Sequence, residues 1–162
     1  VKFGSNNQEV TEQELDAVCE TADILETISQ LEHGYETILG ERGVNLSGGQ
    51  KQRLSIARSL LRKPEILVLD DCLSAVDTET EDKILKELQK DQKNRTTVIV
   101  SHRISTIRNA KHIIVIDDGT VIEEGSHSTL IKRKGFYFDL YKKQQSDLKD
   151  DLIDDSNHET QI

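Results

Sequence analysis

The sequence lacks three features that would each define a class of protein. It has no apolar run of the roughly 20 residues that a transmembrane helix needs, and its longest runs, such as Ile113–Ile116, have the length of strands. It has no extended stripe of lysine and arginine, and its net charge is −9, which argues against a nucleic-acid-binding surface. No secretory signal opens it. A chain of 162 residues with 35% apolar content is instead expected to form one globular domain.

Cysteine and proline are also scarce. The two cysteines, Cys19 and Cys72, lie far apart and fit no metal-ligand spacing, which indicates reduced thiols in a cytosolic setting. Cys19 falls on the apolar face of a predicted helix and is expected to pack in the core. The single proline, Pro64, is expected to stop a helix, because the residue before a proline avoids helical angles.

Capping signals mark the helices ahead of that proline. Thr11 to Glu14 form a capping box, in which a threonine and a glutamate satisfy each other's backbone N–H groups at the start of a helix. A second short helix is predicted over 24–32, ending near Gly34, and a longer one over 47–62.

Downstream of Pro64, apolar strands alternate with helices. Strands are predicted over 66–70, 97–101, 112–117 and 120–124, and helices over 78–90, 104–109, 126–134 and 136–145. Continuous apolar strands separated by helices indicate a mostly parallel sheet covered on both faces, with an antiparallel ribbon at one end. The predicted fold class is therefore α/β. The last residues, 146–162, hold six acidic residues and one lysine and are expected to be a disordered tail.

The start of the long helix reads Ser47-Gly48-Gly49-Gln50. Serine followed three residues later by glutamine is a capping box, but a cap does not explain two glycines in the first turn, each costing about 1 kcal/mol relative to alanine. Close approach of a phosphate to bare N–H groups at the positive end of a helix would offset that cost. From the residues alone, a plain cap and a phosphate site both remain open.

A pair of carboxylates, Asp70 and Asp71, ends the first apolar strand, and His102 follows the next one. Ligands of open α/β sheets gather at the carboxyl ends of strands, so these side chains are candidates for holding magnesium through water, polarising an attacking water and contacting a phosphate. The plain alternatives are a turn that satisfies loop amides and an exposed histidine. Ser74 to Asp77 read as a loop that ends in a helix cap.

Together, the segments LSGGQKQRLSIARSLLRKPEILVLDD, SAVD and VSHR resemble the ATP-binding-cassette family in order and spacing. The resemblance covers residues 1–145 and is closest to the exporters, whose cassettes carry stretches like Glu41-Arg42-Gly43, SHRISTI and DGTVIEEG. It implies a P-loop NTPase-like, RecA-like core over 46–145 with part of the family's helical subdomain over 1–45. It also implies ATP and Mg²⁺ as cofactors.

The family's roles carry over by position. Ser47, Gly48, Gly49 and Gln50 match the signature motif, which contacts the terminal phosphate of ATP held by the opposite cassette. Ile66–Asp70 match Walker B, in which Asp70 is the magnesium-ordering residue, and Asp71 matches the catalytic carboxylate. Ser74 and Asp77 match the D-loop, and His102 matches the switch histidine. Val1-Lys2-Phe3-Gly4 match the segment after the Q-loop.

Two departures from the family pattern qualify this resemblance. No phosphate-cradling GxxxxGKS or GxxxxGKT loop occurs in the chain, which begins with valine, so a C-terminal part of a cassette, incomplete at its N-terminus, is expected. Asp71 stands where hydrolytic cassettes carry glutamate, which implies a slow site of the kind found in heterodimeric exporters. The partners expected are a second cassette, in a heterodimer, and a transmembrane domain of the same polypeptide, at the cytoplasmic face of the plasma or inner membrane.

Two other functions remain open. One is a regulatory subunit that binds ATP without useful hydrolysis, and the other is a soluble, non-transport cassette ATPase.

Overall fold

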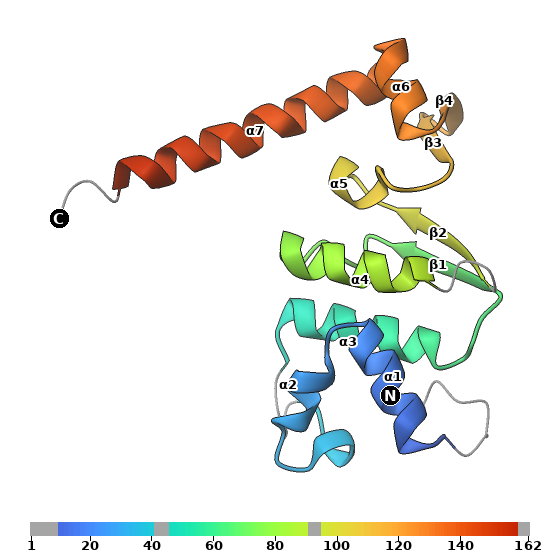
Figure 1. The fold of residues 1–162 in the computed structure, drawn as a ribbon, viewed down its shortest axis with the longest axis vertical. Coiled ribbons are helices and arrows are strands. Elements are labelled where there is room, and N and C mark those ends of the chain that lie inside the picture. Colours follow the sequence, from blue (N-terminus) through green and yellow to red (C-terminus); the bar gives the residue numbers. More distant parts are fainter. Residues whose placement is uncertain (1–9, 41–45, 91–94, 159–162) are drawn as a thin grey trace. The chain divides into compact units, whose positions relative to one another are not determined.

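The computed structural model describes residues 10–40, 46–90 and 95–158, and the side chains of these up to residue 147. The chain divides into two compact units, Val1–Val100 and Ser101–Ile162. Figure 1 gives the order of the elements along the chain. The matches at Val1-Lys2-Phe3-Gly4 and Glu41-Arg42-Gly43 lie outside the described residues.

The first unit begins with helices whose ends are set by local capping. Thr11 caps α1 in the predicted capping box with Glu14, and Ser47 caps α3 in a second one with Gln50. The predicted helix over 24–32 is shorter in the structure and ends at Ser29. The bounds are α1 Glu12–Thr21, α2 Leu25–Ser29, η2 Gly34–Glu36, α3 Gly48–Leu60, β1 Ile66–Asp70, α4 Thr78–Lys90 and β2 Thr96–Val100.

β1 and β2 pair in parallel, with Ile66 opposite Thr96 and Asp70 opposite Val100. Leu67 and Leu69 point into a core built with α1, α3 and α4, where each fully buried leucine contributes about 1.5–3 kcal/mol. Cys19 packs in the same core and is fully buried, as predicted.

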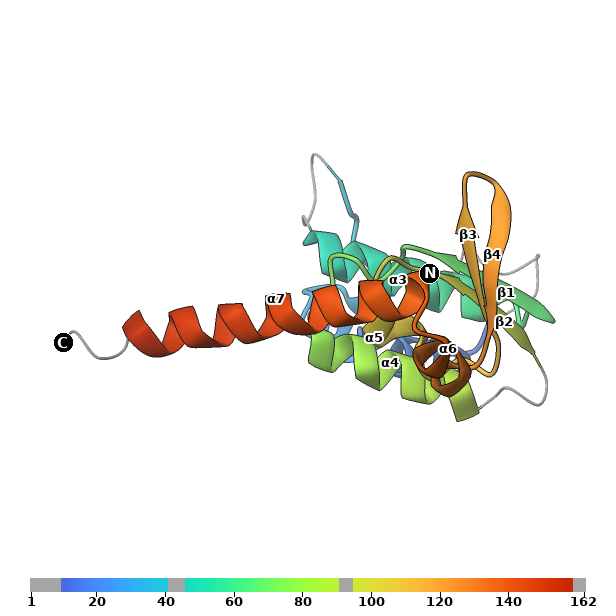
Figure 2. The same cartoon turned by 90° about the horizontal axis from the view of Figure 1, so that it is seen from above.

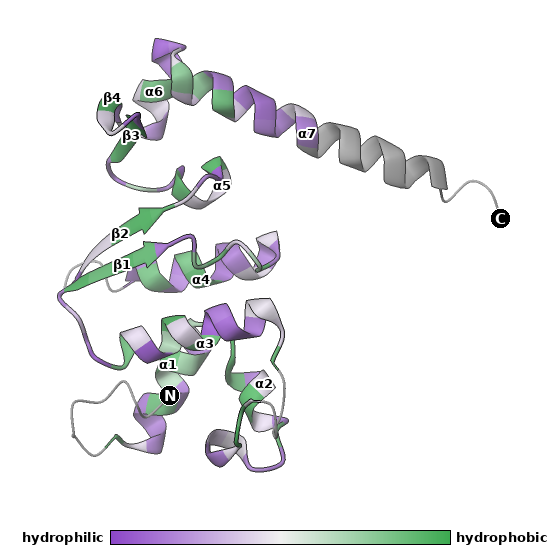
Figure 3. Cartoon of the chain, turned by 180° about the vertical axis from the view of Figure 1, so that it is seen from behind, coloured by the Kyte–Doolittle hydropathy of each residue, from purple (hydrophilic) through white to green (hydrophobic). Residues whose placement is uncertain are grey.

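The expectation that this strand is buried on both faces is wrong for the described structure. Ile66 and Val68 on the other face of β1 are 66% and 60% exposed, because the described helices cover only the face that carries Leu67 and Leu69. Figure 3 shows the ribbons of both strands coloured as largely hydrophobic.

The second unit contains the predicted hairpin and three helices. Asp118 and Gly119 both have positive φ, 45° and 71°, as the two-residue turn between β3 and β4 requires. The strands pair in antiparallel fashion with a bulge at Val115/Ile116, and Figure 2 shows the hairpin as a narrow ribbon. The bounds are α5 Ile104–Ile107, β3 Ile113–Asp117, β4 Thr120–Gly125, α6 His127–Arg133 and α7 Phe136–His158.

Helix α7 is longer than the sequence predicts. Its end at His158 replaces the predicted end at Gln145, because residues 146–158 contain neither proline nor glycine to stop the helix. The separate prediction that the acidic segment 146–162 lacks stable order in solution stays a prediction.

Candidate functional site

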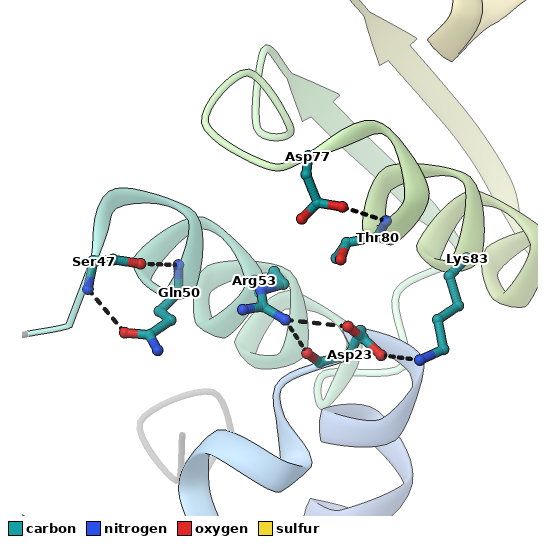
Figure 4. A network of polar contacts seen from close by, with 7 residues as sticks. All are labelled: Asp23, Ser47, Gln50, Arg53, Asp77, Thr80 and Lys83. Carbon is teal, nitrogen blue, oxygen red and sulfur yellow. Dashed lines mark hydrogen bonds and ion pairs between the residues drawn. The ribbon is translucent and has the colours of Figure 1, made fainter. Parts of the chain in front are cut away.

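The first turn of α3 is closed by reciprocal hydrogen bonds between Ser47 and Gln50. The Gln50 N–H donates to Ser47 Oγ at 3.2 Å, and the Ser47 N–H donates to Gln50 Oε1 at 2.9 Å (Figure 4). Ser47 and Gly48 are exposed, and the first turn of this 13-residue helix carries no acidic residue. The positive end of α3 therefore faces solvent with no acidic side chain of its own first turn to neutralise it, a setting that suits an anion.

Gly49 has a packing reason that the sequence did not reveal. A Cβ at Gly49 would lie 2.6 Å from the carbonyl oxygen of Ala75, a backbone atom that cannot move aside cheaply. A Cβ at Gly48 would meet only the Ala75 Cβ, at an ordinary 3.6 Å. The loop at Ala75 thus accounts for one of the two glycines, and only Gly48 is free to serve a ligand alone.

The loop at Ser74–Asp77 is held against α3 by Gln52, a residue that sequence reasoning missed. The Gln52 Nε2 donates to Ser74 Oγ at 3.0 Å, and the Ala75 N–H donates to Gln52 Oε1 at 2.9 Å. Gln52 lies three residues after Gly49 and hence on the same helix face. The available signal in the sequence was a glutamine, with its long amide side chain, on the same helix face as a glycine against which a loop can pack.

Asp77 ends this loop as a helix cap. The Thr80 N–H donates to Asp77 Oδ1 at 2.9 Å, and the Glu81 N–H donates to the Asp77 carbonyl at 2.9 Å. The hydrogen bond from the Thr80 backbone is the main cause that lowers the pKa of the Asp77 carboxyl. The capping role proposed from sequence is confirmed.

The Asp77 cap predicts a loss of stability in acid. Because the folded pKa is lowered, the cap stabilises the chain fully above the unfolded pKa of about 4 and is lost as the pH falls through the folded value. Thermal unfolding from pH 7 to about pH 3 is expected to show Asp77→Asn less stable than the native chain at pH 7, with the difference closing in acid. A difference that does not change with pH would contradict the charged cap.

The two carboxylates follow β1 as predicted, and both are exposed. The backbone of Asp71 is fixed on both sides. Its N–H donates to the Val100 carbonyl at 3.0 Å, and its own carbonyl accepts from the N–H and Oγ of Ser74 at 3.3 and 2.9 Å. Asp71 has φ 46°, in the left-handed region that aspartate tolerates better than most residues.

The described residues around Asp70 do not form an all-protein metal cage. Within the described ranges no group of three or more histidine, cysteine, aspartate and glutamate residues is placed to hold a metal ion. Magnesium, however, is commonly bound by one or two carboxylates, water and substrate phosphates. The exposed Asp70 carboxylate at the end of β1 fits that arrangement.

A polar network fixes α3 midway along its length. Arg53 donates to both the carbonyl and the carboxylate of Asp23, the latter at 3.1 Å, and Lys83 of α4 contacts the other carboxylate oxygen at 2.6 Å (Figure 4). Asp23 lies between α1 and α2 with φ 52°. The Asp23 carboxylate therefore joins three parts of the chain: the link between α1 and α2, helix α3 and helix α4. This attachment fixes the direction of the glycine-containing first turn of α3.

His102 belongs to the second unit, so the prediction that it lies beside Asp70 stays a prediction. Its side chain is exposed, and its backbone is held by Gln144 of α7. The Gln144 Nε2 donates to the His102 carbonyl at 2.7 Å, and the Ile104 N–H donates to Gln144 Oε1 at 2.9 Å. Sequence reasoning missed Gln144, although it lies seven residues after the buried Tyr137, on the apolar stripe of α7.

The chain is similar to known proteins of one family. The sequence model of the ABC transporter family matches residues 3–74. The chain is 48% identical over 132 residues to the ATP-dependent lipid A-core flippase of Vibrio vulnificus, covering 82% of the chain and 23% of that protein. It is 47% identical over 135 residues to the multidrug resistance protein pgp-1 of Caenorhabditis elegans, covering 83% of the chain and 10% of that protein.

A solved structure extends the likeness to the fold. The structure of a bacterial Atm1-family ABC exporter with ATP bound matches 88% of this chain and 25% of its own chain, with a TM-score of 0.81 at 42% sequence identity. The chain belongs to the ABC transporter family. The α/β fold class of an ABC nucleotide-binding domain is thereby confirmed. Domains of this family are ATPases.

The ABC transporter relatives are longer than this chain, which spans from about a tenth to a quarter of their length. Over the part of the chain that the structure describes, no helix is long and apolar enough to cross a membrane. The functions of the individual residues are taken up below as proposals.

Proposed function

We propose that this chain is the nucleotide-binding domain of an ABC exporter that lends its signature motif to ATP held by a second cassette. Ser47, Gly48, Gly49 and Gln50 present the positive end of α3 to the terminal phosphate. The observation that carries this proposal is the capped, exposed first turn of α3, which has no acidic residue of its own. The Asp23 network holds that turn in a fixed direction.

The chain's own ATP site is the weaker of the two. Asp70 orders Mg²⁺ through water, His102 contacts the terminal phosphate, and Asp71 polarises the attacking water. Aspartate is shorter than glutamate by one methylene, about 1.5 Å, and a displacement of about 1 Å can cost on the order of 100-fold in rate. An intact signature beside a shortened catalytic carboxylate supports a heterodimer in which this chain completes the faster site of its partner.

The setting proposed is a membrane transporter. The relatives named above are a flippase, a multidrug resistance protein and an ABC exporter. By analogy, the chain works at the cytoplasmic face of the plasma or inner membrane, joined in one polypeptide to a transmembrane domain. ATP-driven closure of the cassette dimer would then drive transport. These names favour an exporter over a soluble, non-transport ATPase.

Photolabelling tests the lent signature. An ATP analogue with a photoreactive group on its terminal phosphate is expected to label the peptide that contains Ser47–Gln50 in the assembled transporter. Labelling of that peptide should disappear when the partner cassette cannot bind ATP. Persistence of the label without partner-bound ATP, or its absence from this peptide in the intact complex, would refute the proposal.

A further inference from the structure

The side chain of Gln52 joins two motifs that the proposed function assigns to different ATP sites. Its two amide ends face one loop: the N–H of Ala75 requires an acceptor, which fixes Oε1 toward Ala75 and Nε2 toward Ser74. The distances, 2.9 and 3.0 Å, are those of well-formed hydrogen bonds. Gln52 is half-buried, so water competes only partly for these bonds.

The contact continues from Ser74 to the backbone of the catalytic carboxylate. A hydroxyl has one proton to donate, and that of Ser74 goes to the Asp71 carbonyl at 2.9 Å, so Ser74 Oγ accepts from Gln52. The result is a directed series from the Gln52 amide through the Ser74 hydroxyl to the Asp71 carbonyl. The Asp71 backbone is left-handed, which makes its orientation dependent on such support.

The same loop packs on the signature turn. The Ala75 carbonyl occupies the space in which a Gly49 Cβ would lie, so the loop and the signature turn are in close backbone contact. Hydrogen bonds on one side of Ala75 and a backbone contact on the other hold it to α3.

We propose that Gln52 is a positioning residue that fixes the loop Ser74–Asp77 and the Asp71 backbone to the signature helix. A displacement of the signature on contact with the partner's ATP then reaches Asp71 in this chain's own site. The coupling of the two sites rests on the proposed function. The attachment of the loop to α3 does not.

Two substitutions separate the two ends of the amide in the intact transporter. Gln52→Ala removes both hydrogen bonds. Gln52→Glu keeps the acceptor for the Ala75 N–H but loses the donor to Ser74, whose hydroxyl must then turn away from Asp71. Ser74→Ala removes the second step of the series, and Ser55→Ala, exposed on the same helix, is the matched control.

Amide hydrogen exchange measures how firmly the loop Ser74–Asp77 is attached to α3, and it does not depend on ATP turnover. The Ala75 amide is expected to exchange about tenfold faster in Gln52→Ala, and at the native rate in Gln52→Glu and Ser55→Ala. An unchanged rate in Gln52→Ala would overturn the attachment.

Steady-state kinetics test the coupling between the signature helix and Asp71 in this chain's own site. In transporters whose partner cassette has its catalytic carboxylate neutralised, so that only this chain's own site contributes, Gln52→Glu, Gln52→Ala and Ser74→Ala are each expected to lower kcat by about tenfold while the KM for ATP stays within about twofold. The double variant Gln52→Ala/Ser74→Ala should fall no further than the more impaired single variant, because both act through one series of bonds. If the losses of kcat in the two single variants multiply in the double variant, or if only the KM for ATP rises, the coupling is refuted. A native transporter without ATPase activity would overturn the proposed function and the coupling, while the exchange result would still decide the attachment.

Discussion

Replacing Asp71 with glutamate is expected to raise the rate of ATP hydrolysis at this chain's own site by up to about 100-fold. The added methylene carries the carboxylate toward the attacking water, whereas the Asp71 backbone stays fixed by the Val100 carbonyl and by Ser74. Steady-state ATPase assays of the intact transporter measure the effect, with the partner's catalytic carboxylate neutralised so that only this site contributes.

The left-handed backbone of Asp71 sets the controls for that experiment. With φ 46°, the position tolerates aspartate and asparagine better than glutamate, so Asp71→Glu should gain turnover while losing a little stability. Asp71→Asn removes the charge without changing the shape and should abolish the residual activity of the site. If Asp71→Glu and Asp71→Ala both leave turnover unchanged, the site does not hydrolyse ATP, and the chain is a regulatory subunit.

Replacing Gly48 with aspartate is expected to lower ATP turnover at the partner's site by about 100-fold while leaving the fold intact. A carboxylate placed about 4 Å from a terminal phosphate repels it by several kcal/mol at the effective dielectric of a protein surface. The same charge at the first turn of α3 stabilises the helix by about 0.3–1 kcal/mol. Activity and stability therefore move in opposite directions, a combination that a misfolded variant does not produce. ATPase assays and thermal unfolding measure the two.

The neighbouring glycine provides the contrast. Gly48→Ala adds a Cβ at van der Waals distance from Ala75 and should change neither property much. Gly49→Ala places its Cβ 2.6 Å from the Ala75 carbonyl. It should destabilise the chain by about 1–2 kcal/mol, because overpacking outweighs the gain in helix propensity. Turnover lost in Gly48→Ala as well as in Gly48→Asp would mean that size rather than charge matters at this turn.

The elements that depend on local sequence were predicted well. Thr11 and Ser47 cap their helices as the sequence indicates, and β1 begins and ends at the predicted residues, because these features are determined within a few positions. The predictions that failed concern features that depend on contacts between distant segments. An apolar strand does not reveal which helices cover it, so the exposure of Val68 was not foreseen.

The candidate site divides in the same way. The signature, the carboxylates and the Asp77 cap are visible as motifs. The function of Gly49 was only half recognised, because its partner Ala75 lies on a loop more than twenty residues away. Gln52 and Gln144 each hold a distant loop through both the oxygen and the nitrogen of a side-chain amide. No short sequence motif predicts such a contact.

The uncovered face of the parallel strands has a practical consequence. Ile66, Val68, Val98 and Val100 form a water-facing hydrophobic surface on a pair of β-strands. Surfaces of this kind promote self-association. Light scattering by the 162-residue chain should therefore rise more steeply than in proportion to its concentration. Val68→Lys, which places a charge on the face away from the buried Leu67 and Leu69, is the substitution expected to give a monodisperse sample.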